Sequence, residues 1–309
     1  MKNFNHLKLP NLYIPGSGKS GTSTLHELLN EHPDICMSTR KEPHFWTDLN
    51  FKKYSDDDFK KYESLFNKKD SIYYGESSTG YFCFPEFISR IKDFYTTPPK
   101  FIIILRNPID RIYSHYWWLK GIGSENKGFR EAILKDFDIE PDVNNKLTEG
   151  NYKSYYQFGL YGKWMTKFIN EFGSENIHII TTEDLKTNPL ETLNSCFTFL
   201  GVNSLESLPE IKNNQTLILK YPTVYKNTKK LIIKENLIRN TIKIFIPKRY
   251  RQKLRRKLYE TVIDLTNTNK PYPKISVEDR LWLKNLYEKD VKILKEITQL
   301  KYNHWKDFN

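Results

Sequence analysis

Short apolar runs alternate with amphipathic segments along the first two thirds of the chain. Runs at Leu9 to Pro15, Ile35 to Met37, Ser71 to Tyr74, Phe101 to Leu105 and Ile177 to Thr181 have the length of strands. The fourth run is apolar at every position, which is typical of a parallel strand covered on both faces. The alternation of strands and helices therefore predicts an α/β fold with a central, largely parallel sheet flanked by helices.

Helical spacing of apolar residues marks the segments between and after these runs. Leu25, Leu28 and Leu29 follow the 3–4 spacing of an amphipathic helix, and another helix is expected from Pro108 through Trp117. Further helices are expected at residues 164–172, 189–200, 236–266 with a break near Pro247, and 277–300. The sequence contains no internal repeat, so we expect one domain over residues 1–309, with the helical region from about 220 to 309 as part of it.

Positive charge is concentrated in one part of the chain. The 309 residues carry a formal net charge of +12, and residues 220–257 hold fourteen Lys and Arg residues against one acidic residue, Glu235. This basic segment has three interpretations: a solvated helix surface, attraction to an acidic acceptor or to an anionic membrane face, or binding to nucleic acid. No recognised nucleic-acid motif accompanies the charge, so we do not expect a nucleic-acid partner.

Other features bound the class of protein. Hydrophobic residues make up 38% of the chain, enough to bury a sizeable core, yet no run approaches the roughly 20 apolar residues of a membrane span. The first nine residues lack the apolar stretch of a secretory signal, and Cys36, Cys83 and Cys196 are too scattered for a disulfide framework or a cysteine zinc site. We therefore expect a globular, cytoplasmic protein.

Glycine, lysine and hydroxyl residues follow the first predicted strand. The segment from Gly16 to Thr24 reads Gly-Ser-Gly-Lys-Ser-Gly-Thr-Ser-Thr and opens the first helix. Glycines let the backbone turn its N–H groups inward, and a helix N-terminus favours an anion. An ordinary glycine-serine turn with an N-cap would explain the glycines but not a lysine followed by four hydroxyl residues. The pattern predicts a P-loop-like phosphate cradle formed by Lys19, Ser20, Gly21, Thr22, Ser23 and Thr24.

The cradle departs from the loop that binds ATP or GTP. Gly18, Lys19 and Ser20 fit the end of the pattern G-x-x-x-x-G-K-[ST], but Tyr13 stands where its first glycine belongs. An NTPase also needs an acidic residue after a second strand to hold Mg²⁺, and the strand at 101–105 is followed by Arg106 instead. This arrangement favours a ligand with a second phosphate and no metal requirement.

These residues resemble motifs of the sulfotransferases that use 3′-phosphoadenosine-5′-phosphosulfate (PAPS). The segment from Lys19 to Thr22 is similar to their 5′-phosphosulfate loop, and residues 106–116 resemble their 3′-phosphate motif, R-[DN]-P-x-x-R-x-x-S-x-[YF]. The resemblance implies that Arg106 and Ser114 clamp the 3′-phosphate. Arg111 is a further candidate for that clamp. An arginine paired with a carboxylate, or a serine bonded to a helix carbonyl, would be the simpler interpretations.

Two more segments are similar to the heparan-sulfate-type and related bacterial sulfotransferases. Residues 41–46, Lys-Glu-Pro-His-Phe-Trp, resemble K-E-x-H-F-F, and residues 75–81 resemble G-E-K-[ST]-P-x-Y. Ser77 and Thr79 stand where many relatives carry a lysine and a proline. The disulfide-closed loop of the animal heparan enzymes has no counterpart here. The resemblance implies a carbohydrate or glycolipid acceptor.

An acceptor hydroxyl needs a base to remove its proton. Glu42 and His44 are two positions apart, so in an extended segment their side chains would point to the same side. Glu42 is the first candidate, which the resemblance supports. His44 is the alternative, although it could equally pack beneath Phe45 and Trp46. Glu76 is a weaker candidate, for which a salt bridge is the simpler interpretation.

The sequence therefore predicts a PAPS-dependent sulfotransferase that releases adenosine-3′,5′-bisphosphate and uses no metal. Lys19 would meet the negative charge that grows on the leaving phosphate. An ATP-dependent kinase with a degenerate phosphate loop is the rival enzyme, and a non-catalytic basic binding protein is the alternative outside enzymes. We expect acceptor specificity to lie in two loops, at residues 50–69 and 121–150.

Overall fold

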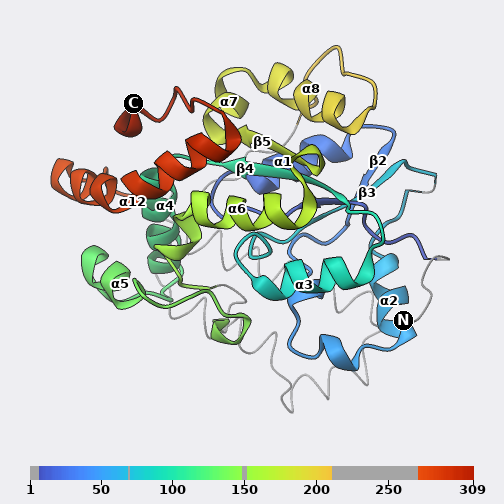
Figure 1. Cartoon of the computed structure of the whole chain (residues 1–309), viewed down its shortest axis with the longest axis horizontal. Coiled ribbons are helices and arrows are strands. Elements are labelled where there is room, and N and C mark those ends of the chain that lie inside the picture. The colour runs from blue at the N-terminus through green and yellow to red at the C-terminus, as the bar shows by residue number, and fades with distance from the viewer. Residues whose placement is uncertain (1–6, 69, 148–151, 211–270) are drawn as a thin grey trace, which may run out of the picture. The chain divides into compact units, whose positions relative to one another are not determined.

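A computed structural model describes residues 7–68, 70–147, 152–210 and 271–309 (Figure 1). The chain divides into two compact units. The first comprises Met1–Ile112, Lys135–Asn214 and Ser276–Asn309, and the second comprises Tyr113–Leu134 and Gln215–Ile275. The helix expected at 236–266 and the basic segment at 220–257 lie outside the described residues.

The first unit is built on a five-stranded parallel sheet with the strand order β2-β3-β1-β4-β5. The strands are β1 (Leu12–Ile14), β2 (Ile35–Met37), β3 (Tyr73–Ser77), β4 (Lys100–Leu105) and β5 (Ile177–Thr181). Because the strands are parallel, their carboxyl ends share one edge of the sheet. The predicted α/β fold with a central parallel sheet is confirmed.

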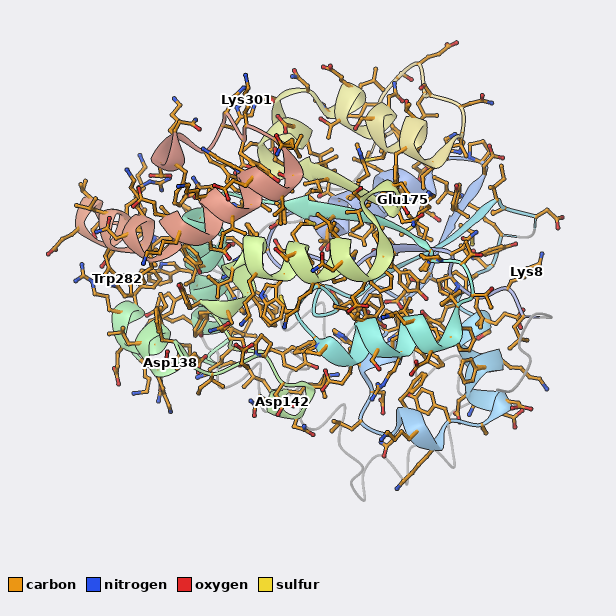
Figure 2. The ribbon with its side chains drawn as sticks, viewed as in Figure 1. Lys8, Asp138, Asp142, Glu175, Trp282 and Lys301 are labelled. Atoms are coloured by element: carbon orange, nitrogen blue, oxygen red, sulfur yellow. The ribbon has the colours of Figure 1, made fainter. Side chains whose placement is uncertain are left out.

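The described residues also form nine α-helices, labelled in Figure 1. They are α1 (Thr22–Asn30), α2 (Asp56–Glu63), α3 (Pro85–Phe94), α4 (Pro108–Gly121), α5 (Phe129–Lys135), α6 (Tyr161–Phe172), α7 (Thr182–Thr187), α8 (Pro189–Leu200) and α12 (Val277–Thr298). None of the described helices is long and apolar enough to cross a membrane. Lys8, Glu175 and Lys301, which are labelled in Figure 2, are exposed.

The two faces of the sheet are covered by different side chains. On one face, Leu12, Ile102 and Ile104 belong to a buried aliphatic cluster with residues of α1 and α8. On the other face, Tyr13 packs edge-on against Phe87 of α3, and Phe101 meets Phe168 and Phe172 of α6. Alternate residues of β1 and β4 therefore enter opposite cores, which explains why residues 101–105 are apolar at every position.

The structure corrects the bounds of one expected strand. The strand expected at 71–74 begins at Tyr73 and continues to Ser77, through Gly75 and Glu76. These residues are not apolar, but Gly75 lies so close to Met37 that a Cβ there would be 2.2 Å from its Sδ. These last residues of the strand allow close approach of a neighbour and make buried polar contacts. A search for apolar runs therefore did not include them.

The two segments expected to be loops also contain helices. α2 lies within residues 50–69 and is introduced by a capping box between Ser55 and Asp58, a local signal that the sequence does carry. α5 lies within residues 121–150. α3, which begins with Pro85, was likewise not expected.

The second unit is described over residues 113–134 and 271–275. Aromatic rings from α4 hold it together: Tyr113 packs edge-on against Phe129 of α5, and Trp117 stacks on Tyr272 with ring centroids 6.2 Å apart. Ser114 of α4 belongs to this unit and is buried. α4 is one continuous helix that begins in the first unit.

Candidate active site

The loop between β1 and α1 carries the predicted phosphate cradle. Two of its residues, Lys19 (φ 71°) and Gly21 (φ 93°), have left-handed backbone. That conformation is strained for a lysine and tends to persist where a functional site requires it. The Ser17 hydroxyl secures the loop, since it lies 2.6 Å from the Ser20 hydroxyl and donates to the Tyr161 hydroxyl at 3.1 Å.

The start of α1 is suited to an anion. Within the described chain no side chain caps this helix, and its first turn, Thr22-Ser23-Thr24, has no acidic residue. N–H groups of a first helical turn have no partner inside the helix and carry the positive end of its dipole. Together with Lys19 just before the helix, they form an arrangement that suits a phosphate.

Arg106 joins the loop from the neighbouring strand. It follows β4, and its Nη1 donates to the backbone carbonyl of Lys19 at 3.2 Å. Burial, together with the positive charges of Arg106 and Lys41, lowers the pKa of Lys19 to about 8. The positive charges of Lys19, Arg106 and Lys41 therefore lie close together at one edge of the sheet, and a bound anion would reduce their mutual repulsion.

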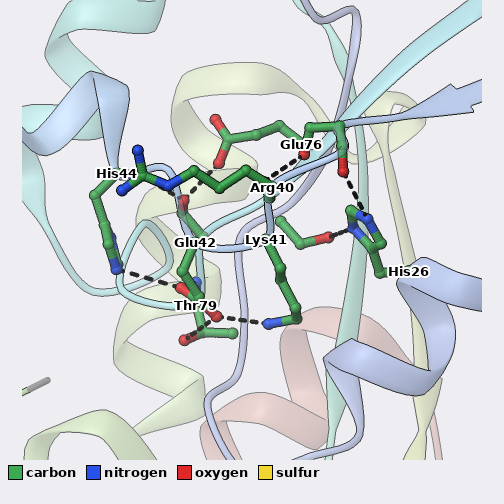
Figure 3. Close-up of polar contacts among 10 residues, drawn as sticks. His26, Arg40, Lys41, Glu42, His44, Glu76 and Thr79 are labelled. Carbon is green, nitrogen blue, oxygen red and sulfur yellow. Dashed lines mark hydrogen bonds and ion pairs between the residues drawn. The ribbon is translucent and has the colours of Figure 1, made fainter. Parts of the chain in front are cut away.

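Glu42 lies at the same edge, beside the segment that follows β3 (Figure 3). Its Oε2 accepts the N–H of Thr79 at 2.9 Å, and its Oε1 accepts the Thr79 hydroxyl at 3.2 Å. Lys41 Nζ donates to the same Oε1 at 2.6 Å. Thr79 also lies against the cradle, because a Cβ at Gly18 would be 3.6 Å from Thr79 Oγ1. Thr79 therefore links Glu42 to the loop that carries Lys19.

His44 contacts Glu42, but the backbone between them does not have the conformation expected from the sequence. The segment is not extended: Glu42 has φ 57° and His44 has φ 53°, so both residues are left-handed. The turn nevertheless places His44 Nε2 3.4 Å from Glu42 Oε2. The His44 ring packs edge-on against Tyr81 and Tyr152, whereas packing beneath the two aromatic residues that follow it had been considered.

Opposing effects set the protonation of this pair. Burial by itself raises the pKa of Glu42, but Lys41, His44 and the N–H of Thr79 outweigh burial and hold the pKa below its ordinary value. Burial lowers the pKa of His44 despite the attraction of Glu42. At neutral pH the carboxylate is therefore ionised and able to accept a proton, and the imidazole is neutral.

Arg111, the further candidate for the phosphate clamp, lies in the protein interior. It is fully buried, and its Nη2 donates to the backbone carbonyl of Tyr155. The part of Arg111 in the 3′-phosphate clamp stays a prediction. Ser114 lies on α4 in the second unit, and its part in a clamp with Arg106 stays a prediction.

Residues near the C-terminus fasten the loop that carries Arg106. Asn107 Nδ2 donates to Asp307 at 2.7 Å, and Arg280 binds Asp307 through Nε at 2.7 Å and Nη2 at 2.6 Å. Arg280 Nη1 also donates to Asp110 in the first turn of α4 at 2.8 Å. No local sequence signal could have revealed this network, because its members are up to 200 positions apart.

Neither Lys41 nor Thr79 was predicted from the sequence as a site residue. Lys41 stands next to Glu42 in the sequence, so its charge could have been assigned to the same site. Thr79 could be found only once the segments after β1 and β3 were known to meet. Among the described residues, no group of three or more His, Cys, Asp or Glu side chains gathers to hold a metal ion.

Comparison with known proteins gives the family. Residues 9–261 match the family described as "Sulfotransferase domain". Carbohydrate sulfotransferase 15 of Mus musculus is 25% identical over 266 residues, a match that covers 68% of this chain and 46% of that protein. Heparan sulfate glucosamine 3-O-sulfotransferase 5 of Mus musculus is 30% identical over 196 residues, covering 63% and 54% respectively. The chain thus spans about half the length of these curated relatives.

A solved structure shows the same fold. The crystal structure of a sulfotransferase from Alicyclobacillus acidocaldarius superposes with a TM-score of 0.66 at 22% identity, over 97% of this chain and all of that one. The family match covers most of the sequence, including the cradle, the Glu42 turn and the Arg106 motif. The chain therefore belongs to the sulfotransferase domain family.

Proposed function

We propose that the chain transfers the sulfuryl group of PAPS to a hydroxyl group of a carbohydrate or glycolipid acceptor. One observation carries the proposal: Arg106 hydrogen-bonds the backbone of Lys19, and Thr79 links Glu42 to the loop that carries Lys19, at the carboxyl edge of the parallel sheet. Ligands of open α/β sheets bind at such an edge. Lys19 and Arg106 follow different strands, so each could bind one phosphate of a nucleotide with two separated phosphates. The carboxylate of Glu42 could accept the proton of the acceptor hydroxyl.

The donor would be held by two groups of residues. Lys19, the N–H groups at the start of α1 and the cradle hydroxyls would bind the 5′-phosphosulfate; the cradle members are Ser20, Gly21, Thr22, Ser23 and Thr24. Arg106 and Ser114 would bind the 3′-phosphate. When bound, PAPS supplies an activated sulfuryl group, and adenosine-3′,5′-bisphosphate is the product.

Glu42 is proposed as the general base. It takes the proton of the acceptor hydroxyl while the acceptor oxygen bonds to sulfur and the bond from sulfur to the 5′-phosphate oxygen breaks. Lys19 and the fixed N–H donors stabilise the charge that develops on the leaving phosphate. His44, which contacts the Glu42 carboxylate, is the alternative base.

The names of the relatives support the acceptor class. One is called a carbohydrate sulfotransferase and another a heparan sulfate glucosamine 3-O-sulfotransferase. Attraction of an acidic acceptor or an anionic membrane face to the basic segment at 220–257 is part of this proposal. A cytoplasmic location, the lack of a nucleic-acid partner and a single domain over 1–309 stay predictions from the sequence.

Transfer of labelled sulfate tests the proposal. The protein is incubated with ³⁵S-labelled PAPS and with cell extract fractionated into glycan, lipid and small-molecule pools. We expect label in the glycan or glycolipid fraction with wild type and much less with Lys19→Ala. Transfer from γ-labelled Mg-ATP would instead support the kinase. Salt-sensitive binding to anionic polymer that survives Lys19→Ala, without transfer to any pool, would support the non-catalytic binding protein.

A further inference from the structure

A buried carboxylate lies next to the Glu42 turn and takes no part in the chemistry above. Glu76, in β3, is 0% exposed. Its Oε1 accepts the Ser78 hydroxyl, and its Oε2 accepts the hydroxyls of Tyr62 at 2.5 Å and Tyr81 at 3.0 Å. These hydroxyls stand in place of the salt bridge considered from the sequence, since no ion pair reaches Glu76 within the part of the chain that the structure describes. A buried carboxylate held only by hydroxyls is costly, so a role beyond packing is expected.

Two of these hydroxyls also hold the backbone of the turn. Ser78 Oγ accepts the N–H of His44 at 3.0 Å, and Tyr81 Oη accepts the N–H of Trp46 at 3.1 Å. A hydroxyl has one proton, so donating it to Glu76 leaves the oxygen to accept from the backbone. An ionised Glu76 therefore fixes the direction of both chains of hydrogen bonds.

The turn that these hydrogen bonds hold is strained. Glu42 and His44 both have left-handed backbone, which side-chain-bearing residues rarely adopt. Such conformations persist only where the surroundings impose them. Figure 3 shows Glu76 close to the segment that carries Glu42 and His44. The Glu76 network supplies two of the anchors that impose the conformation.

We propose that Glu76 is a positioning residue for sulfuryl transfer: through Ser78 and Tyr81 it locks the turn that presents Glu42 and His44 to the acceptor. The inference rests on the proposed function. It assigns Glu76 no contact with donor or acceptor. Its loss should therefore misplace the base and lower kcat, while binding of the nucleotide at the cradle is retained.

The groups around Glu76 give the network a pH dependence. It is faced by Tyr13 of β1, Tyr62 of α2, Tyr81, Tyr95 and the carboxylate of Glu42. Burial raises the pKa of Glu76 to about 7, and the charge of Glu42 acts in the same direction. A protonated carboxyl group donates from one oxygen, so one of the three hydroxyls can no longer donate to that oxygen. We expect the turn to loosen as the pH falls below about 7.

Two matched tyrosine variants test the inference. Tyr62→Phe and Tyr81→Phe each remove one hydroxyl from Glu76 Oε2 and keep the ring, but only Tyr81 also holds the backbone of the turn. We expect Tyr81→Phe, Ser78→Ala and Glu76→Gln to lower kcat by roughly tenfold or more, with an unchanged KM for PAPS. Tyr62→Phe should stay within about twofold of wild type. The acidic limb of kcat near pH 7 should disappear in Glu76→Gln.

The outcomes separate this inference from the proposed function. Equal losses of kcat in Tyr62→Phe and Tyr81→Phe, or an acidic limb retained in Glu76→Gln, would overturn the positioning role of Glu76. The proposed function would not be affected by either result. If Glu76→Gln does not fold, the tyrosine pair still decides. If wild type transfers no label from PAPS to any pool, the proposed function fails and this inference fails with it.

Discussion

The guanidinium of Arg106 donates a hydrogen bond to the backbone carbonyl of Lys19. This contact joins the ends of β4 and β1, which are neighbours in the sheet. The two residues are 87 positions apart, and each was assigned from the sequence to a different phosphate of one ligand. Their contact brings the two proposed phosphate sites within reach of a single nucleotide.

Replacing Lys19 tests the proposed stabilisation of the leaving group. We expect Lys19→Ala to lower turnover by about two orders of magnitude or more, since one preorganised donor to a developing charge contributes about 3 kcal/mol. Steady-state kinetics with ³⁵S-labelled PAPS measure the change. Lys186→Ala removes an exposed lysine of α7 and serves as the control, which should keep wild-type turnover. Equal turnover in both variants would refute the role of Lys19.

Because the pKa of Lys19 is lowered, we expect a basic limb in the pH profile of nucleotide affinity. The charged form binds the anion and predominates below a pKa of about 8, so affinity for adenosine-3′,5′-bisphosphate should fall as the pH rises through 8. Arg106 and Lys41 both lower this pKa, so Arg106→Gln and Lys41→Met should each move the limb to higher pH. Titrations across pH 6–10 measure it. A limb that stays in place in both variants would contradict the proposed coupling.

The base can be assigned by comparing two conservative variants. Glu42→Gln keeps the shape of the side chain but cannot take a proton, so kcat should fall by roughly 10²–10⁴-fold. His44→Gln should cost less, because the imidazole contacts the carboxylate and is the second choice as base. Binding of adenosine-3′,5′-bisphosphate should change little in either variant. A larger loss in His44→Gln than in Glu42→Gln would transfer the role to His44.

Glu76 should make the fold less stable at higher pH. Its pKa of about 7 exceeds the ordinary value of 4.5, so the folded state binds the proton more tightly than the unfolded state. Its contribution is complete below pH 4.5 and is lost as the pH rises to 7, by up to about 3 kcal/mol. The free energy of unfolding of Glu76→Gln should lack this decline, whereas Tyr62→Phe should keep it. Parallel pH profiles of Glu76→Gln and wild type would contradict the prediction.

The fold could be predicted where burial alone decides the structure. Phe101 to Leu105 enter two cores on opposite faces, and a strand buried on both faces must be apolar throughout. The bounds of β3 were predicted wrongly because its last residues are Gly75, Glu76 and Ser77. These residues make close backbone and polar contacts, which a pattern of apolar residues does not reveal. The helix α2 was missed although its capping box is legible in the sequence.

The candidate site was predictable in its residue types but not in its geometry. Lys19 and Arg106 were predicted because loops that bind phosphate have a local signature, and the structure brings the two residues together. The proximity of Glu42 and His44 was expected from an extended segment, but a left-handed turn produces it. Such a turn depends on hydroxyls from the segment after β3, and no pattern within residues 41–46 reports them.

The most direct measurement is a calorimetric titration with adenosine-3′,5′-bisphosphate in the presence of EDTA, beside titrations with adenosine 5′-monophosphate and with Mg-ATP. We expect the bisphosphate to bind one site without Mg²⁺ and more tightly than the monophosphate, and we expect Lys19→Ala and Arg106→Ala each to weaken it. Equal affinity for bisphosphate and monophosphate, or binding of Mg-ATP alone, would contradict the claim that Lys19 and Arg106 hold the two phosphates of one PAPS molecule.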